Sequence, residues 1–311
     1  MLLFFVLFLA AGTNPSFVHA QPLPPSPSAS PSLRPKSIFL LAGQSNMAGR
    51  GGVVNGTSTG WIATWDGIVP PECGPNPSIL RLTANLTWVK AREPLHADID
   101  TNKTNGIGPG MAFANTILGQ DRSLGSVGLV PCAVGGTRIS EWERGSFLYD
   151  QLMRRARART SDGGTIRALL WYQGESDTVA ESDAALYKRR LEKFFSDVRA
   201  DLQSPELPIL QVAIASGQGP FTETVRKAQL GLDLPNVQTV DAKGLPLEPD
   251  QLHLTTPAQV QLGRMLAGAF LRSMSRSASL VGEASTSGPN LVIHVLAFFM
   301  WKFVRAVLMN R

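Results

Sequence analysis

Five short, continuous apolar runs, separated by helix-like stretches, constrain the fold of this 311-residue chain most strongly. The runs occupy residues 37–42, 126–132, 166–172, 208–215 and 236–241. They are continuous rather than alternating, which is typical of strands covered on both faces. Helical patterns lie at residues 110–118, 146–159, 182–202, 222–230 and 257–274. This alternation predicts an α/β fold in which a five-stranded parallel sheet lies between two layers of helices.

The N-terminal 35 residues are unlike a folded domain. Residues 2–11 are uninterruptedly apolar but too short to span a bilayer, and a small-x-small cleavage pattern ends at Ala20. We therefore expect a signal peptide at residues 1–20. Because no Lys or Arg precedes the apolar run, a retained signal anchor is the alternative. Residues 21–35 are rich in Pro and Ser and predict an extended linker, which is followed by a folded domain at residues 36–274.

Residues 275–311 form a second segment outside the expected domain. A small, polar stretch predicts a linker up to residue 290, and the apolar run 291–301 is followed by Lys302 and Arg305. The run is much shorter than the ~20 residues of a membrane span, and a longer span would bury both cations. Three interpretations remain: a loosely packed tail, an amphipathic helix with weak membrane association, or a processed lipid-anchor signal.

The charge and the cysteine and histidine content exclude several classes of function. The formal net charge of +5 is modest and dispersed, which argues against nucleic-acid binding. Two cysteines and four histidines show no metal-ligand spacing, so neither a metal nor a cofactor is expected. Cys73 and Cys132 either pair in an oxidising compartment or remain buried free thiols. Three sequons, at Asn55, Asn85 and Asn102, predict glycans on exposed loops between the first two strands.

The segments that directly follow the strands carry candidate catalytic groups, because ligands bind beyond the carboxyl ends of parallel strands. Ser45 lies in GQSNMAGRGG after the first run, where a glycine-flanked turn would project its hydroxyl. Gly136, in AVGGT after the second run, can point a backbone N–H into a site. Gln173, after the third run, can offer a side-chain N–H to an oxyanion. Each segment taken alone is equally compatible with ordinary turn chemistry, such as a helix cap.

The histidines narrow the choice of a general base. His19 leaves with the signal peptide and His294 lies in the tail. His96 has no strand end before it, which favours a structural or surface role. His253 remains, and Asp250 three residues earlier can orient its ring and stabilise the imidazolium formed during acyl transfer. The convergence of these groups at one sheet edge predicts the chemistry of a serine esterase.

Five motifs give the chain a specific resemblance. GQSNMAGRGG, GIGPGMAFA, GLVPCAVGGT, WYQGESD and DQLHLTTPAQVQLG together resemble the SGNH (GDSL-like) hydrolase superfamily, and within it the plant carbohydrate esterases with a sialate O-acetylesterase-type domain. The resemblance covers residues 36–272 and implies a flavodoxin-like three-layer α/β/α sandwich. The site residues that it implies are Ser45 as nucleophile, Asp250 and His253 as acid and base, and the Gly136 N–H and the Gln173 side chain as oxyanion donors. The superfamily's GDS motif is GQS here, and Gln173 stands where the superfamily has Asn.

Together these features predict a secreted, extracellular serine esterase that removes acyl groups, above all acetyl, from carbohydrate such as cell-wall polysaccharide. Small acyl esters or lipids are the alternative substrates. A catalytically idle carbohydrate-binding protein and a membrane-tethered scaffold are the alternative classes. Four tryptophans in expected loop regions either stack on sugar rings or pack within the protein: Trp61, Trp65, Trp88 and Trp142.

Overall fold

The computed structural model describes residues 35–54, 63–160 and 163–286. All of them belong to the compact unit Leu33–Arg311. The predicted signal peptide (1–20), nearly all of the linker and tail residues 287–311 lie outside the described residues, as do Asn55 and Trp61. Within the described ranges, no helix is both long enough and apolar enough to span a bilayer.

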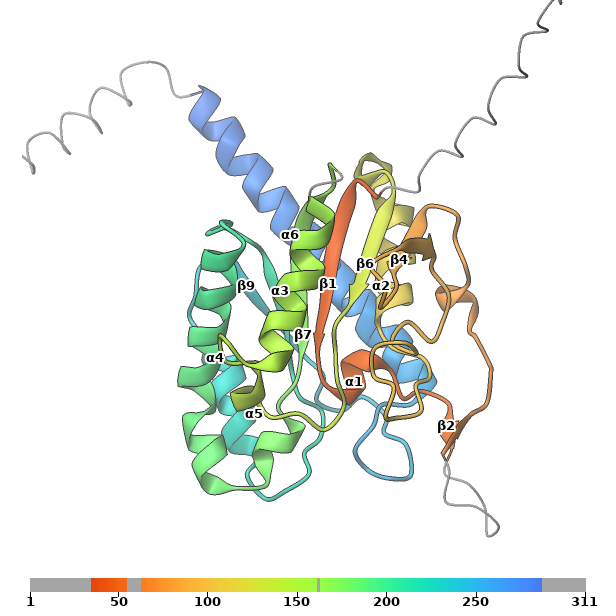
Figure 1. The fold of residues 1–311 in the computed structure, drawn as a ribbon. Coiled ribbons are helices and arrows are strands. Elements are labelled where there is room, and N and C mark those ends of the chain that lie inside the picture. Colours follow the sequence, from red (N-terminus) through yellow and green to blue (C-terminus); the bar gives the residue numbers. More distant parts are fainter. Residues whose placement is uncertain (1–34, 55–62, 161–162, 287–311) are drawn as a thin grey trace, which may run out of the picture. The chain divides into compact units, whose positions relative to one another are not determined.

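A seven-stranded sheet forms the centre of the fold (Figure 1). Its strands, in spatial order, are β5 (Trp88–Lys90), β4 (Ile79–Leu82), β6 (Val127–Pro131), β1 (Ser37–Gly43), β7 (Thr165–Tyr172), β8 (Ile209–Ala213) and β9 (Val237–Asp241). Neighbouring strands are parallel, except that β5 runs antiparallel to β4. The predicted α/β sandwich is confirmed and each predicted run coincides with a strand, but the expected number of five strands was wrong.

The two additional strands come from the segment between β1 and β6, which we expected to be loop-rich and exposed. β4 lies beside β6, with Ile79 paired to Val127, and a tight turn returns the chain as the edge strand β5. These strands have only four and three residues and include Arg81, so they lack the long apolar run that identified the other five. A separate two-stranded sheet pairs β2 (Val53–Val54) with β3 (Thr64–Trp65).

Helices cover both faces of the large sheet (Figure 1). On one face lie α2 (Gly110–Gln120) and α6 (Thr256–Thr286), and on the other lie α3 (Phe147–Thr160), α4 (Glu181–Asp201) and α5 (Thr222–Leu230). Each helix coincides with a predicted one, although α6 continues past the expected end at residue 274. Phe39 of β1 joins the sheet to the first layer through Phe113 and Phe270, whose ring centroids both lie 5.0 Å from its own.

The second helical layer packs on an aromatic cluster. Trp171 of β7 contacts Phe194 of α4 at a ring-centroid distance of 4.5 Å and Trp142 at 5.2 Å. Phe194 is almost completely buried, so its replacement by Ala would cost roughly 3–5 kcal/mol of stability. Trp88 and Trp142 are both buried, so these two tryptophans pack within the protein and present no ring face to a sugar. Trp65 is partly buried and packs against the core.

Three groups that sequence reasoning left open are buried in this fold. Cys73 and Cys132 are free thiols, so they do not form a disulfide with each other. Burial raises the pKa of Cys132 to about 11 and that of Cys73 well above its usual range, which keeps both groups protonated. His96 is also buried, and burial lowers its pKa to about 3, so the ring is neutral and structural.

Candidate active site

The turn that follows β1 fixes the position of Ser45. β1 ends at Gly43, whose φ of 128° favours glycine, and a Cβ there would lie 2.0 Å from the Tyr172 carbonyl oxygen on β7. The chain therefore turns sharply into α1 (Ser45–Ala48), a single helical turn. Ser45 opens α1, so its backbone N–H has no acceptor within the helix. The residue is 5% exposed and lies at the carboxyl edge of the sheet.

A short loop between β9 and α6 carries Asp250 and His253. An antiparallel bridge between Leu247 and Leu254 closes this loop. Within it, one carboxylate oxygen of Asp250 accepts N–H bonds from Leu252 and His253, each 2.9 Å long. This turn, formed between the Asp side chain and the backbone that follows it, brings the carboxylate next to the imidazole three residues later.

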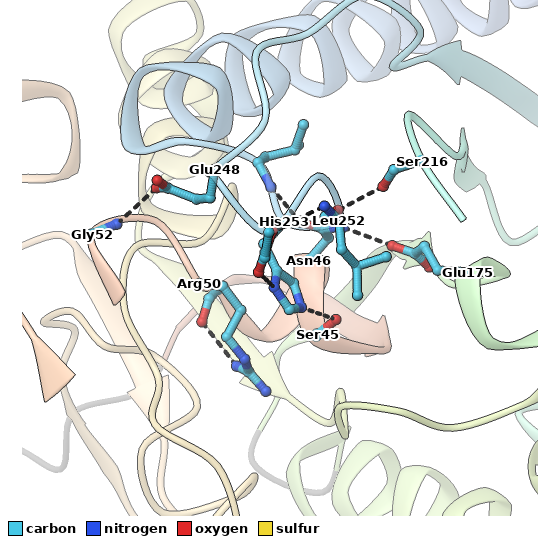
Figure 2. Close-up of polar contacts among 12 residues, drawn as sticks. Ser45, Asn46, Arg50, Gly52, Glu175, Ser216, Glu248, Leu252 and His253 are labelled. Carbon is cyan, nitrogen blue, oxygen red and sulfur yellow. Dashed lines mark hydrogen bonds and ion pairs between the residues drawn. The ribbon is translucent and has the colours of Figure 1, made fainter. Parts of the chain in front are cut away.

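Ser45, His253 and Asp250 form a continuous hydrogen-bonded chain. His253 Nε2 lies 3.0 Å from Ser45 Oγ (Figure 2). On the other side of the ring, Nδ1 lies 2.6 Å from Asp250 Oδ2. Burial acts to raise the pKa of Asp250, but the N–H bonds from His253 and Leu252 and the imidazole itself hold it below its ordinary value. The carboxylate is therefore ionised at neutral pH and is able to orient the ring and stabilise an imidazolium.

The glycine pair after β6 borders the nucleophile. A Cβ built on Gly135 would lie 3.5 Å from Ser45 Cβ and 2.5 Å from Arg50 Nη2, so a larger residue would collide there. Asp100 fixes this turn, because its buried carboxylate accepts the Gly135 N–H at 3.2 Å and pairs with Arg50 at 2.5 Å. Gly136 follows at a φ of 79°, is exposed, and donates its N–H to no acceptor within the part of the chain that is described. The turn thus leaves an unused donor next to the Ser45 segment.

Gln173 lies beneath this turn rather than in the open site. Its side chain is wholly buried, and Nε2 donates to the Thr137 carbonyl oxygen at 2.8 Å and to Asp177 Oδ2 at 2.6 Å. Because an amide nitrogen has two hydrogens, this geometry leaves none for the oxyanion role that the sequence suggested for Gln173. The bond to Thr137 instead holds the residue that follows Gly136.

A cleft of about 400 Å³ opens beside His253. Its walls are the loop 248–250 on one side and residues Val53, Lys103 and Thr104 on the other. A hollow of this size next to a serine–histidine pair suits a small ligand, with apolar and polar groups both available to position it. Among the residues that the structure describes, no cluster of His, Cys, Asp and Glu has the three members needed to hold a metal ion.

Comparison with known sequences decides the family. Residues 35–272 match the family described as carbohydrate esterase, sialic acid-specific acetylesterase. The chain belongs to this family. The predicted resemblance is thereby confirmed, and the chain is a carboxylic ester hydrolase of the carbohydrate acetylesterase type. The Arabidopsis thaliana protein named "Probable carbohydrate esterase At4g34215" is 56% identical to this esterase over 239 residues, which are 76% of this chain and 91% of that protein.

Solved structures agree with the fold of this esterase. The crystal structure of the Arabidopsis thaliana protein AT4G34215 superposes with a TM-score of 0.74 at 56% identity, covering 76% of this chain and 98% of that one. NanS superposes with a TM-score of 0.62 at 16% identity, covering 78% and 99%. XAC1771, described as a carbohydrate acetylesterase from Xanthomonas citri, gives 0.50 at 18% identity, covering 75% and 55%. The last two likenesses show a shared fold.

Asn46 of this esterase has a structural role that motif reasoning missed. Its Nδ2 donates to Glu175 Oε1 at 2.7 Å and to the Leu252 carbonyl oxygen at 3.3 Å (Figure 2). Its Oδ1 accepts the Leu254 N–H at 2.9 Å. Asn46 therefore joins the residues on both sides of His253 to the helix that begins with Ser45. Its place directly after Ser45 was the available sequence signal, but its partners lie 129 to 208 residues away.

Proposed function

We propose that this carbohydrate esterase is exported from the cell and deacetylates cell-wall polysaccharide through an acyl-enzyme on Ser45. The observation that carries the proposal is the hydrogen-bonded chain from Ser45 through His253 to Asp250, which borders the 400 Å³ cleft. A serine hydroxyl becomes a useful nucleophile only when a base lies within hydrogen-bond reach, and here that base has its own orienting carboxylate.

The first half of the reaction transfers the acetyl group to the enzyme. His253 Nε2 accepts the Ser45 hydroxyl proton as Oγ forms a bond to the acetyl carbonyl carbon. The carbonyl oxygen becomes an oxyanion that the N–H groups of Ser45 and Gly136 stabilise. As the tetrahedral intermediate collapses, the bond from the carbonyl carbon to the sugar oxygen breaks, and the imidazolium protonates that oxygen, which leaves as a hydroxyl.

The second half releases acetate. His253 deprotonates a water molecule as its oxygen attacks the acetyl carbonyl carbon of the acyl-enzyme. The bond from that carbon to Ser45 Oγ then breaks, acetate leaves, and the imidazolium returns the proton to Oγ. Asp250 stays ionised throughout and stabilises the imidazolium in both halves. Gln173 acts on this cycle through position alone, because it holds Thr137 and so sets the direction of the Gly136 N–H.

Deacetylation itself is tested by acetate release from acetylated xylan, with the secreted chain and its Ser45→Ala variant assayed side by side. We expect release from the native chain and none from the variant. If neither acetylated xylan nor a simple aryl acetate is hydrolysed, the acyl-enzyme mechanism is wrong. The carbohydrate-binding alternative is then supported by xylan binding without turnover.

Export is supported by the pattern at residues 1–20 and by the sequons at Asn85 and Asn102, whose asparagines are exposed. Fractionation of cells that express the full chain, or a chain lacking residues 289–311, tests it. We expect both forms in the medium, with glycans that an N-glycosidase removes. Retention of the full chain alone on membranes would assign a membrane anchor to the tail, and cytosolic accumulation of both forms would overturn export.

A further inference from the structure

We propose that a groove beside Phe147 is a second sugar-binding subsite, distinct from the cleft at His253. The inference rests on the proposed function and deepens it, because it assigns the substrate to the oligomeric or polymeric glycans. A monosaccharide ester or small acyl ester at Ser45 would leave this groove unused.

The groove has a volume of about 160 Å³ and lies between α3 and the loop that precedes α2. Its lining combines apolar and polar side chains from Ile99, Val134, Phe147, Leu148, Gln151 and Arg154. Phe147, the first residue of α3, is 75% exposed, the largest exposed fraction among the large hydrophobic residues described. A single exposed hydrophobic residue is common on protein surfaces, but this one forms the edge of a hollow.

Two segments connect the groove to the catalytic site. Val134 in its wall is followed directly by Gly135, which borders Ser45. The loop that gives Ile99 to the groove continues through Asp100 to Lys103 in the wall of the cleft. The groove and the cleft therefore border the same loop, and beneath the surface the buried Asp100 carboxylate ties that loop to Gly135. A glycan chain with its ester at Ser45 would extend over this loop toward the groove.

The side chains of the groove match the chemistry of a sugar ring. An aromatic ring stacks on the C–H face of a pyranose. Phe147 offers a large, exposed apolar ring for such a contact at little conformational cost. Arg154 is exposed and donates from Nε and Nη2 to Gln151 Oε1, at 3.1 and 2.8 Å, which holds the guanidinium in place. Its remaining N–H groups are donors for sugar hydroxyl or carboxylate oxygens. The one carboxylate in the wall, Asp98, is already paired with Arg81.

Kinetics on substrates of different length test the subsite. The full chain, its Phe147→Ala and Phe147→Tyr variants and the control Leu230→Ala are assayed on an aryl acetate and on acetylated xylo-oligosaccharides of increasing length. Leu230 is also an exposed hydrophobic residue, 50% exposed, and lines neither hollow. For Phe147→Ala we expect a loss in kcat/KM of about tenfold on the longer oligosaccharides, equal to ~1.4 kcal/mol, carried by KM, with unchanged aryl acetate hydrolysis. Phe147→Tyr should restore the activity and Leu230→Ala should match the native chain.

The outcomes are distinguishable. Equal losses on both substrates, or no loss on the oligosaccharides, would show that Phe147 contributes no subsite. If the native chain hydrolyses neither substrate, the proposed function itself fails. Calorimetry with deacetylated xylo-oligosaccharide and the Ser45→Ala chain then measures the affinity for sugar without turnover. Binding that an added Phe147→Ala change removes supports the subsite, whereas no binding overturns it. Sedimentation of the same two chains completes the test, because a Phe147→Ala effect on self-association alone, with no effect on sugar binding, also overturns the subsite.

Discussion

Two parts of the site are built in opposite ways. One is the loop that carries Asp250 and His253. The other is the buried polar network beneath Ser45, made of Gln173, Glu175 and Asp177. In the loop, the Asp250 side chain is 37% exposed, the His253 ring is 21% exposed, and their contact spans three residues. In the network, Gln173 and Glu175 are wholly buried, and each contacts residues that are distant in sequence. In the proposed mechanism the loop holds the general base His253 and the carboxylate that orients it, whereas the network holds the backbone around them.

The difference shows that the reactive groups and the groups that keep the site rigid belong to separate parts of the site. Groups that titrate and meet the substrate need access to the cleft, and a local turn is enough to set their mutual geometry. Groups that position the turns need complete burial, where a hydrogen bond is stronger and an unpaired partner is costly. Variants of the loop should therefore lose activity with little loss of stability, and variants of the network should lose both.

The strongest test of this division is Ser45→Ala, at the junction of the two regions. We expect kcat on an aryl acetate to fall by at least about 10⁴-fold, because the nucleophile is lost. The thermal unfolding midpoint should change little, since the side chain is small and the backbone turn at Gly43 is retained. Steady-state kinetics and calorimetry measure both quantities. A residual activity within tenfold of the native value would place the nucleophile elsewhere.

Asp250→Asn should have the next largest effect. Asn keeps an oxygen for the N–H groups of Leu252 and His253, so the turn and the stability are retained. The imidazolium loses its carboxylate, and we expect kcat to fall by roughly 10³-fold. Asp233→Asn, at an exposed carboxylate outside the site, is the matched control. A large drop in unfolding free energy for Asp250→Asn, without a drop in kcat, would contradict the division between loop and network.

Gln173→Ala and Asp177→Ala test the network side. Either change leaves buried partners unpaired, and we expect each to lower the unfolding free energy by about 1–3 kcal/mol. Both should also reduce kcat by roughly 10- to 100-fold, since the Gly136 N–H is no longer held in direction. Denaturant unfolding and kinetics are measured on the same samples. If Gln173→Ala alone loses activity and stays fully stable, Gln173 is a direct oxyanion donor.

The last prediction concerns Glu175 and the pH dependence of stability. Burial raises its pKa from 4.5 to about 7, so the folded state binds the proton more tightly than the unfolded state between these values. Its contribution is complete below pH 4.5 and is lost as the pH rises through about 7. Unfolding free energies from pH 4 to 8 should therefore fall less steeply for Glu175→Gln than for the native chain. Asp177, with its pKa raised to about 6, adds a slope of the same sign that remains in the variant.

The control for this pH series is Glu223→Gln, which changes an exposed carboxylate on α5. Its stability profile should follow that of the native chain. If Glu175→Gln also keeps the full native slope, burial of this carboxyl does not govern the pH dependence of stability. The Glu175 carboxyl is then more accessible to water than its burial in the structure indicates.

Local sequence patterns were enough to predict much of the fold and part of the candidate site. β1, β6 and β8, found from apolar runs, are buried along their whole length, and continuous hydrophobicity records that burial directly. The pairing of Asp250 with His253 was also accessible, because a turn of three residues depends on neighbours in the chain. Helices such as α5 at Thr222–Leu230 were located to the residue by their own periodicity.

The remaining features depend on contacts between residues far apart in the sequence, and only the tertiary structure decided them. β4 and β5 are too short to be identified alone and exist because β6 offers an unpaired edge. Gln173 follows a strand as an oxyanion donor would, yet Thr137 and Asp177 take both of its N–H groups. A side chain's direction is set by the partners that folding brings to it, and residue type and spacing along the chain do not encode those partners.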